Sequence, residues 1–499
     1  MHDALIAGAG PTGLFLALQL AKKGRGVRLV EANAKPSGLS RAIAILPRSM
    51  EAFRIAGIAA PFEAAAHRVT SLCVYSGGQI VGKVPMDAKR SWYDYVAIVP
   101  QNLTEDILRE ALLAAGGTVE YETRLVALVD GPEEVVVRLQ SPRGDERVSA
   151  RYVVGCDGAH STVRDLIGFG SEGGSYSESF AIADVDTVGD VPPDEITICT
   201  HAAGLLEIFP MTTKRRRVIA SVAGAPASEV TLDAVNELIG ERGPWNIGAT
   251  KLHSGSRYHI EHRLTHGMQK GRIFLAGDAS HVHSPFAGQG LNTGLQDALN
   301  LAWKLDYSLA GFATSGLLAS YSPERHAVAK DVIRATDLGT RLMTTKNAFA
   351  RAVRDWAMPN VLESARFQRL FLSHFTGLGT HYARSPIVAG SGLRAADELV
   401  RSGDRERRLY DVLDGRHLLV YPAVCPLGVA ESFANFAQHY GGAVVPISSE
   451  SAGLPLVRLV RPDGYVALET AIGDDPTPSI EKLAGVLETH VRRVGRNTG

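Results

Sequence analysis

The pattern of hydrophobic and polar positions predicts a strand, a helix and a second strand at the N-terminus. Residues 3–7 are mainly apolar and are typical of a short buried strand. Apolar residues recur at helical spacing from Pro11 to Lys23, and Gly24 supplies a helix stop. Residues 27–30 form the second strand, which ends at Glu31. The chain therefore begins with a βαβ unit.

The turn in this unit reads Gly8-Ala9-Gly10-Pro11-Thr12-Gly13. In a dinucleotide-binding unit, glycines at these positions allow a tight turn, a close approach of a pyrophosphate, and close packing of helix on strand. The helix N-terminus offers unpaired N–H groups to the phosphates, and Glu31 can accept hydrogen bonds from a ribose. An ordinary glycine-rich turn is the alternative, but strand, helix and acid in register favour an adenine dinucleotide.

A second glycine-rich turn follows another buried strand, residues 273–276. Asp278 in this turn is suited to accept a hydrogen bond from the ribityl chain of a flavin. The tract from Pro285 to Gly290 leads into an amphipathic helix, whose N–H groups at Gly290 to Asn292 would point at the flavin's pyrimidine edge. Because an extended dinucleotide must be held at both ends, the two turns together indicate FAD.

His281 and His283 stand at HxH spacing within the second turn, which raises a metal site as an alternative. No third ligand lies near them in the sequence, so we expect local packing or hydrogen bonding and no metal.

The middle and the C-terminal parts lack these turns but show legible strands. Residues 417–421 predict a strand, Val429 to Ala437 a helix, and residues 456–467 a hairpin around Pro462-Asp463-Gly464. The middle strands are predicted at Ser71–Tyr75, Phe180–Val185, Glu195–Thr200, Leu205–Phe209 and Val218–Val222.

Composition narrows the class of protein. A chain of 499 residues implies two or three domains. The net charge of −1 argues against a nucleic-acid binder, and no apolar run is long enough to span a bilayer. The first residues lack the features of a signal peptide, so we expect a cytoplasmic protein. The four cysteines are scattered without a CxxC pair, which predicts reduced thiols.

The two turns and the segments between them resemble the single-component FAD-dependent aromatic hydroxylases of the para-hydroxybenzoate hydroxylase fold, in the longer branch that includes phenol and polyketide-tailoring hydroxylases. The resemblance implies an α/β fold with a Rossmann-type FAD-binding domain, an inserted β-sheet substrate domain and a C-terminal thioredoxin-like domain without a CxxC pair. The implied boundaries are 1–68, 97–174 and 264–390 for the first, 69–96 and 175–263 for the second, and 395–499 for the third.

The resemblance also assigns cofactor-binding positions. Arg41 would contact the flavin, Gln101 would bind FAD, and Val126 would touch the adenine through its backbone. Asp157 lies in a similar Asp-Gly motif, in which Arg164 would meet a phosphate of NADH or NADPH. The full set is Gly8, Gly10, Pro11, Thr12, Gly13, Glu31, Ala32, Arg41, Gln101, Val126, Asp157, Asp278, Gly288, Gly290, Leu291 and Asn292.

The implied activity is an NAD(P)H-dependent monooxygenase that uses O2 and FAD to hydroxylate a phenolic or polycyclic aromatic compound through a C4a-hydroperoxyflavin. Pro285 would place a backbone carbonyl near the reacting ring. A flavin reductase or dehydrogenase on the same fold, and a non-catalytic FAD-binding or thioredoxin-like protein, are the alternatives. The C-terminal domain could lie at a subunit interface, so the sequence allows a homodimer.

The resemblance does not assign the residues of the substrate pocket. Lys214 to Arg217 could dock a nucleotide phosphate, although a solvated face is the simpler interpretation. The pocket candidates, each with a core or surface alternative, are Trp92, Tyr93, Tyr95, Phe209, Pro210, Met211, Tyr258 and His259.

Overall fold

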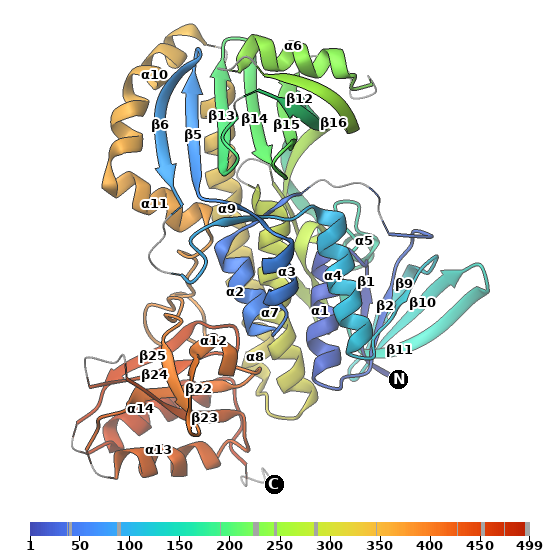
Figure 1. Cartoon of the computed structure of the whole chain (residues 1–499). Coiled ribbons are helices and arrows are strands. Elements are labelled where there is room, and N and C mark those ends of the chain that lie inside the picture. The colour runs from blue at the N-terminus through green and yellow to red at the C-terminus, as the bar shows by residue number, and fades with distance from the viewer. Residues whose placement is uncertain are drawn as a thin grey trace.

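The computed structural model contains three units (Figure 1). It describes residues 1–36, 38, 42–86, 91–189, 191–222, 229–243, 247–283, 288–345, 347–426, 428–450, 455–473 and 475–494, with the backbone alone for residues 175–178, 259 and 260. Each helix in these ranges is too short or too polar to cross a bilayer.

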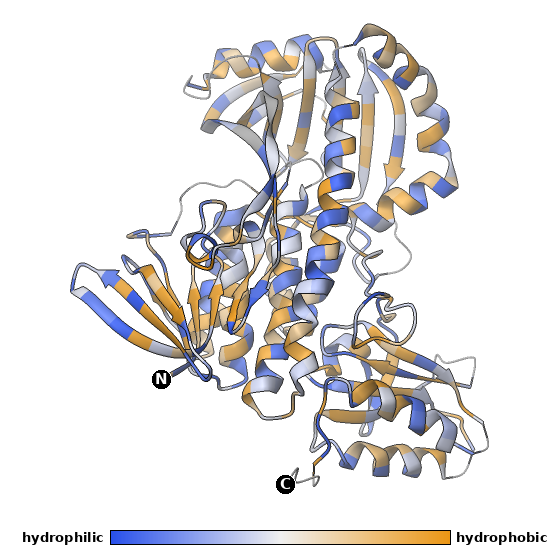
Figure 2. Cartoon of the chain, turned by 180° about the vertical axis from the view of Figure 1, so that it is seen from behind, coloured by the Kyte–Doolittle hydropathy of each residue, from blue (hydrophilic) through white to orange (hydrophobic). Residues whose placement is uncertain are grey.

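The first unit is built on a mainly parallel sheet. Its strands are β1 (His2–Ala7), β2 (Val27–Val30), β8 (Val119–Glu120), β9 (Arg124–Asp130), β10 (Val135–Ser141), β11 (Gly144–Gly155), β17 (Gln269–Lys270) and β18 (Ile273–Leu275). The order is β17-β18-β11-β1-β2-β8, and β9 and β10 extend β11 as an antiparallel ribbon. Since β1 pairs in parallel with β2 and β11, the predicted βαβ unit lies at the centre. The outer end of the ribbon is hydrophilic (Figure 2).

Helices and a small three-stranded sheet surround this parallel sheet. They are α1 (Pro11–Lys22), α2 (Pro47–Ile55), α3 (Ala59–Ala65), α4 (Gln101–Ala114), α5 (Thr162–Leu166), η1 (Gly277–Ala279), α7 (Gln289–Leu309) and α8 (Ser315–Ala319), with strands β3 (Ala44–Ile45), β4 (His67–Val69) and β7 (Val96–Ile98). Leu14 of α1, Leu108 of α4 and Leu295 of α7 share one buried cluster. These three helices therefore pack together on one face of the sheet.

The second unit is an eight-stranded sheet in the order β19-β16-β12-β15-β14-β13-β5-β6. Its elements are β5 (Ser71–Ser76), β6 (Gln79–Pro85), β12 (Ser171–Val188), β13 (Glu195–His201), β14 (Gly204–Pro210), β15 (Arg215–Val222), β16 (Gly248–Thr265), β19 (His281–Val282), α6 (Leu232–Arg242), α9 (Tyr321–Thr344), α10 (Ala348–Glu363) and α11 (Ala365–Phe375). Every middle strand expected from the sequence is present, and β12 is longer than expected because it pairs along its whole length with β16.

The two faces of this sheet differ in what covers them. Leu206 and Ile208 pack in one cluster with Val235 of α6, so this helix covers the outer face (Figure 1). Leu205 and Phe209 instead share a cluster with Leu362 of α10 and with further residues of α11 and β3. We call this second side the inner face. It connects the sheet to the FAD-binding unit.

The third unit is a thioredoxin-like sheet in the order β21-β20-β23-β22-β24-β25. Its elements are β20 (Leu399–Ser402), β21 (Arg405–Arg408), α12 (Leu409–Val412), β22 (His417–Pro422), α13 (Val429–Gln438), β23 (Val444–Ser449), β24 (Leu456–Val460), β25 (Val466–Ala471) and α14 (Thr477–Leu487). As expected, α13 joins two parallel strands and β24 and β25 form the hairpin. The α/β fold class with three units is confirmed.

Candidate functional site

The first glycine-rich turn contains two glycines that the fold itself requires. Gly8 has φ +102°, and a Cβ there would overlap the backbone of Cys156. A Cβ at Gly13 would overlap the carbonyl of Gly8. Glycine is the residue that tolerates a positive φ and such close backbone packing. These positions therefore hold the βαβ unit together.

Gly10 differs from its neighbours because no described atom lies within 4 Å of a Cβ built on it. Its φ of −72° and ψ of 179° are open to any residue. It stands at the N-cap of α1, Pro11 occupies the first turn, and no side chain in the described ranges caps the helix. The positive end of α1 is therefore left open beside Gly10, as a pyrophosphate site requires.

Thr12 joins this turn to the second one. A Cβ at Gly277 would lie 2.7 Å from its Oγ1, and a Cβ at Gly294 of α7 would overlap the same atom. Both glycines thus make room for Thr12. The N-termini of α1 and α7 are held side by side, although the two turns are far apart in the sequence.

Glu31, the expected ribose acceptor, lies at the end of β2. Its Oε2 accepts from the Ala9 N–H at 2.9 Å, and its Oε1 accepts from the backbone and side chain of Asn33 at 2.9 and 2.7 Å. The carboxylate therefore fixes the glycine-rich turn, and the next residue, Ala32, is exposed.

Gln101 and Val126 occupy positions suited to a ligand contact. Gln101 begins α4, accepts from the Ala42 N–H at 3.2 Å and donates to Glu105 at 2.9 Å. Val126 is the extra residue of a β-bulge, since Ala127 pairs with Arg138 and Leu125 with Leu139. A bulged residue has no ladder partner, so its backbone can serve a ligand. Arg41 lies outside the described residues.

The Asp-Gly motif around Asp157 packs against the first turn. Asp157 accepts from the Ser161 hydroxyl at 2.5 Å and from the Val163 N–H at 3.1 Å, and burial raises its pKa. Arg164 is 7% exposed, and its guanidinium donates to the carbonyls of Ala159 and Ala279 at 3.0 and 3.4 Å. Arg164 thus braces the second turn and does not present its charge to a nucleotide phosphate.

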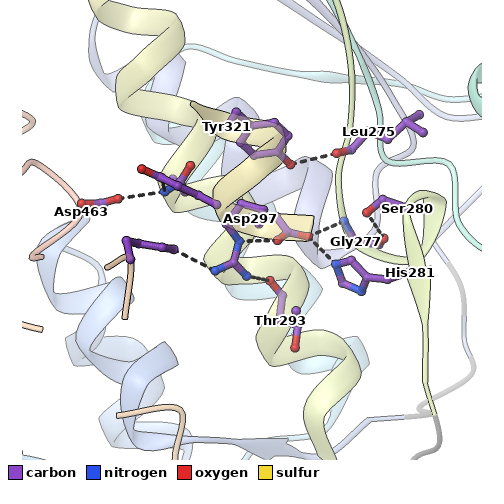
Figure 3. Close-up of polar contacts among 12 residues, drawn as sticks. Leu275, Gly277, Ser280, His281, Thr293, Asp297, Tyr321 and Asp463 are labelled. Atoms are coloured by element: carbon purple, nitrogen blue, oxygen red, sulfur yellow. Dashed lines mark hydrogen bonds and ion pairs between the residues drawn. The ribbon is translucent and has the colours of Figure 1, made fainter. Parts of the chain in front are cut away.

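The second turn is organised by Asp297 of α7, which sequence reasoning missed (Figure 3). Its carboxylate accepts from the Gly277 N–H at 2.9 Å, from His281 Nε2 at 2.7 Å and from Arg325 Nε at 2.6 Å. Burial works to raise the pKa of Asp297, but Arg325 and His281 lower it to about 2. Asp278, next to this cluster, is exposed.

The HxH pair belongs to the same hydrogen-bonded chain. His281 Nδ1 lies 3.0 Å from His283 Nε2, and the two rings stack. Burial and the neighbouring His281 lower the pKa of His283 to about 3. Among the described residues no group of three His, Cys, Asp or Glu could hold a metal ion. The contacts of the two rings show the local hydrogen bonding and packing that the sequence suggested.

The N-terminus of α7 is shaped by Gly288 and Asn292. Gly288 has φ +63° and caps the helix. Asn292 donates to the carbonyls of Ala44 and Gly288 at 2.8 and 2.7 Å and accepts from the Leu46 N–H at 2.9 Å. The nearest described atom to a Cβ at Gly290 is 4.0 Å away. Leu291 is half-buried, and Pro285 lies outside the described residues.

The structure separates the pocket candidates. Phe209 lies on the inner face, and Met211 and Tyr258 pack against it, while Pro210 ends β14. The side chain of His259 lies outside the described part. Tyr93 and Tyr95 take the core alternative, since they belong to the core of the first unit. Trp92 takes the surface alternative: it is 56% exposed, and the guanidinium of Arg408 in the C-terminal unit lies 4.0 Å from its ring centre.

The basic run at residues 214–217 is not a phosphate-binding cluster. Because it enters strand β15, Arg217 is buried against Asp184 at 2.7 Å and Arg216 donates to the carbonyl of Thr212. Arg215 pairs with Asp186, and only Lys214 of the run is exposed.

These features fit FAD. The open Gly10 leaves space for a pyrophosphate at α1, the bulge at Val126 offers backbone groups, and the open Gly290 allows a flat ring to approach α7. The chain matches the family described as FAD binding domain over residues 1–336.

Two relatives and one solved structure show what the chain is similar to. It is 32% identical to 6-methylpretetramide 4-monooxygenase of Streptomyces rimosus, over 93% of this chain and 90% of that protein. It is 32% identical to rifampicin monooxygenase of Streptomyces venezuelae, over 93% and 95%. The anhydrotetracycline hydroxylase OxyS of Streptomyces rimosus superposes with a TM-score of 0.80 at 28% identity, covering 98% of both chains.

Proposed function

The chain belongs to the FAD binding domain family, and we propose that this FAD-dependent monooxygenase hydroxylates a polycyclic aromatic compound that carries a phenolic hydroxyl group. The relatives at 32% identity are monooxygenases by name, of 6-methylpretetramide and of rifampicin, and they align over nearly the whole chain. This supports oxygen insertion over the hydride-transfer alternative. The co-substrates are NADH or NADPH and, in this proposal, O2.

The observation that carries the proposal is the pair of open helix N-termini. Thr12 holds α1 beside α7, and both helices begin at glycines that leave room for a ligand, Gly10 and Gly290. Bound FAD would accept hydride from the nicotinamide and activate O2 for transfer to the ring. The positive end of α7 would stabilise negative charge at the pyrimidine edge.

The chain's own residues would position the cofactor. Gly10 and the first turn of α1 would hold the pyrophosphate, and Glu31 with Gln101 would orient the groups on either side of it. Asn292 would fix the backbone of β3 against the start of α7. The cluster around Asp297 would keep the second turn rigid, because the buried carboxylate bonds to Gly277, His281 and Arg325.

The inner face would form the substrate wall. Apolar strands β13, β14 and β15 meet residues of α10, α11 and β3 in one cluster. A wall of this kind suits a flat, hydrophobic ring system and excludes water from the reacting centre. Exclusion of water matters because activated oxygen otherwise leaves as hydrogen peroxide.

The test is aerobic oxidation of NADH and NADPH by the purified FAD-loaded protein, with phenols, naphthols and tetracyclic phenols including anhydrotetracycline. We expect a tetracyclic phenol to accelerate oxidation and to gain one oxygen atom by mass spectrometry, with 18O2 as the source. The Gly10→Val variant serves as the FAD-free control. Acceleration in which the compound itself is reduced, with no 18O incorporated and no hydrogen peroxide formed, would contradict the proposal and favour hydride transfer.

A further inference from the structure

The inner face contains one carboxyl group that the cofactor site does not explain. All seven residues of β14 are buried, and Glu207 at its centre is only 3% exposed. Its neighbours across the sheet are Ile198 on β13 and Ile219 on β15. An ionisable side chain in such surroundings is costly to keep unless a partner compensates its burial.

Glu207 has no such partner in the described part of the chain: no hydrogen bond or ion pair to its carboxyl is found there. Two other buried charges in the same sheet are paired. Glu195 on β13 is 4% exposed and bonds to Lys83 at 2.7 Å, and Arg217 on β15 is held by Asp184 at 2.7 and 2.8 Å. Glu207 differs from these groups, and also from the buried Arg216 on β15, which donates to backbone carbonyls.

Burial raises the pKa of Glu207 to about 8, so the group keeps its proton at neutral pH. A protonated carboxyl can both donate and accept a hydrogen bond. A neutral hydroxyl group is a matching partner, since it too donates and accepts.

The position of Glu207 connects it to the substrate wall. Side chains alternate along a strand, so Glu207 shares its face with Leu205 and Phe209. Both belong to the cluster that contains Ala44, whose carbonyl accepts from Asn292 at the start of α7. The carboxyl thus lies on the face that meets β3, and Asn292 ties β3 to the start of α7, whereas the outer face under α6 carries Leu206 and Ile208.

We propose that Glu207 is the polar anchor of the substrate site, and that its carboxyl hydrogen-bonds a hydroxyl group of the polycyclic aromatic substrate. This rests on the proposed function. An apolar wall binds a polycyclic compound strongly but does not fix its position along the wall. One buried polar group fixes the orientation of the compound and selects hydroxylated compounds. An unpaired carboxyl that costs stability in the free protein gains its partner when such a compound binds.

The first test compares 2-hydroxyanthraquinone with 2-methoxyanthraquinone, which lacks the donor, by equilibrium dialysis against the FAD-loaded protein. We expect the wild type to bind the hydroxy compound at least about tenfold more tightly. Glu207→Leu should reduce this preference to less than about twofold, and Glu207→Gln, which keeps an acceptor and a donor, should retain part of it. Glu195→Gln is the matched control, since it alters a buried but paired carboxyl, and should keep the full preference.

A second measurement separates an anchor from a structural group. Because no partner is lost, Glu207→Leu should raise the melting temperature of the substrate-free protein. Glu195→Leu should lower it, because the buried Ser71 hydroxyl loses its acceptor. A wild type without preference for the hydroxy compound, a preference that survives in Glu207→Leu, or a lowered melting temperature in that variant would each overturn the anchor. If one of these results is found but the wild type still incorporates oxygen, the anchor is wrong and the proposed function stands. If the binding and melting results are as expected but no compound gains oxygen, the proposed function alone is refuted.

Discussion

Gly10 and Gly13 stand three residues apart in one turn, yet they serve different purposes. A Cβ at Gly13 would overlap the protein's own backbone, whereas a Cβ at Gly10 would meet no described atom. The space at Gly13 is thus filled by the fold, and the space at Gly10 is kept for a ligand. The distinction can be tested because substitution at each residue should affect a different property.

We expect Gly10→Ala to leave the free energy of unfolding of the FAD-free protein within about 0.5 kcal/mol of the wild type. FAD affinity should fall at least about tenfold, because the methyl group occupies the approach of the pyrophosphate. Gly13→Ala is the control, and should unfold the FAD-free protein more easily. Fluorescence titration of FAD and thermal denaturation measure the two effects. Equal FAD affinity in Gly10→Ala and wild type would place the pyrophosphate elsewhere.

Glu207 predicts a pH dependence of stability with a definite sign. Its pKa is about 8 in the folded protein against an ordinary value of 4.5, so between these values the folded state binds more protons than the unfolded state. Its contribution to stability is therefore complete below pH 4.5 and lost as pH rises through 8. Glu207→Gln should gain stability relative to the wild type over this window, by up to about 1.4 kcal/mol per pH unit. Urea denaturation at a series of pH values measures the difference in free energy of unfolding between the variant and the wild type. If this difference does not change with pH, the carboxyl is ionised in the folded protein.

At the scale of elements, periodicity predicted β1, β2 and β18 of the first sheet, β5, β12, β13, β14 and β15 of the second, and the hairpin of β24 and β25. It did not predict other strands of these sheets, among them β11 and the long β16. It could not show that the hairpin turn is buried. Pro462-Asp463-Gly464 is typical of a solvent-exposed turn, but Asp463 is 1% exposed because the turn inserts against α7 and α9. Nor could it identify Asp297, whose partners Gly277 and Arg325 come from other elements.

The missing information is in each case a long-range pairing. Glu207 illustrates the limit most clearly, because Leu205 to Phe209 reads as one apolar run interrupted by a single acid. Sequence alone does not say whether that acid is paired. The cofactor turns, by contrast, are formed by residues that are adjacent in the sequence, such as Gly8 to Gly13. The spacing of these glycines was therefore enough to predict where the turns lie and which elements flank them.

Asp297 connects three elements, so its charge should matter more than its hydrogen-bonding shape. Asp297→Asn would leave Arg325 buried without a counter-charge, and we expect a loss of about 3–5 kcal/mol in the free energy of unfolding. Removing both charges in Asp297→Asn with Arg325→Gln should cost clearly less than the sum of the single changes. Chemical denaturation of the FAD-free proteins measures this coupling. Strictly additive losses would show that the pair is not a unit.

At the scale of the whole molecule, the C-terminal unit is joined to the FAD-binding unit by buried charges. Arg461 in the hairpin turn donates at 2.7 and 2.9 Å to Glu324 in the first turn of α9, which packs into the core of the FAD-binding unit through Tyr321. The side chains of Arg461 and Glu324 are fully buried. Lys304 of α7 bonds to the same carboxylate at 2.7 Å, and burial lowers its pKa to about 8. The Arg48 guanidinium donates to the carbonyl of Asp463 at 2.6 Å. The thioredoxin-like unit is therefore fixed to the FAD-binding unit. This attachment agrees with a structural role for a unit that lacks the CxxC pair of redox-active thioredoxins.

This attachment predicts how the two units unfold. Wild-type protein should show a single calorimetric transition, because breaking the contact exposes buried charges of both units together. Arg461→Met removes the bonds to Glu324 from the C-terminal side, and should split the transition, with the C-terminal unit melting first. Arg458→Met is the matched control, since Arg458 lies on the neighbouring strand and pairs at 2.5 Å with Glu398 inside the same unit. It should lower the melting temperature without dividing the transition. If Arg461→Met instead keeps one transition, shifted no further than that of Arg458→Met, the units must be coupled mainly by apolar contacts.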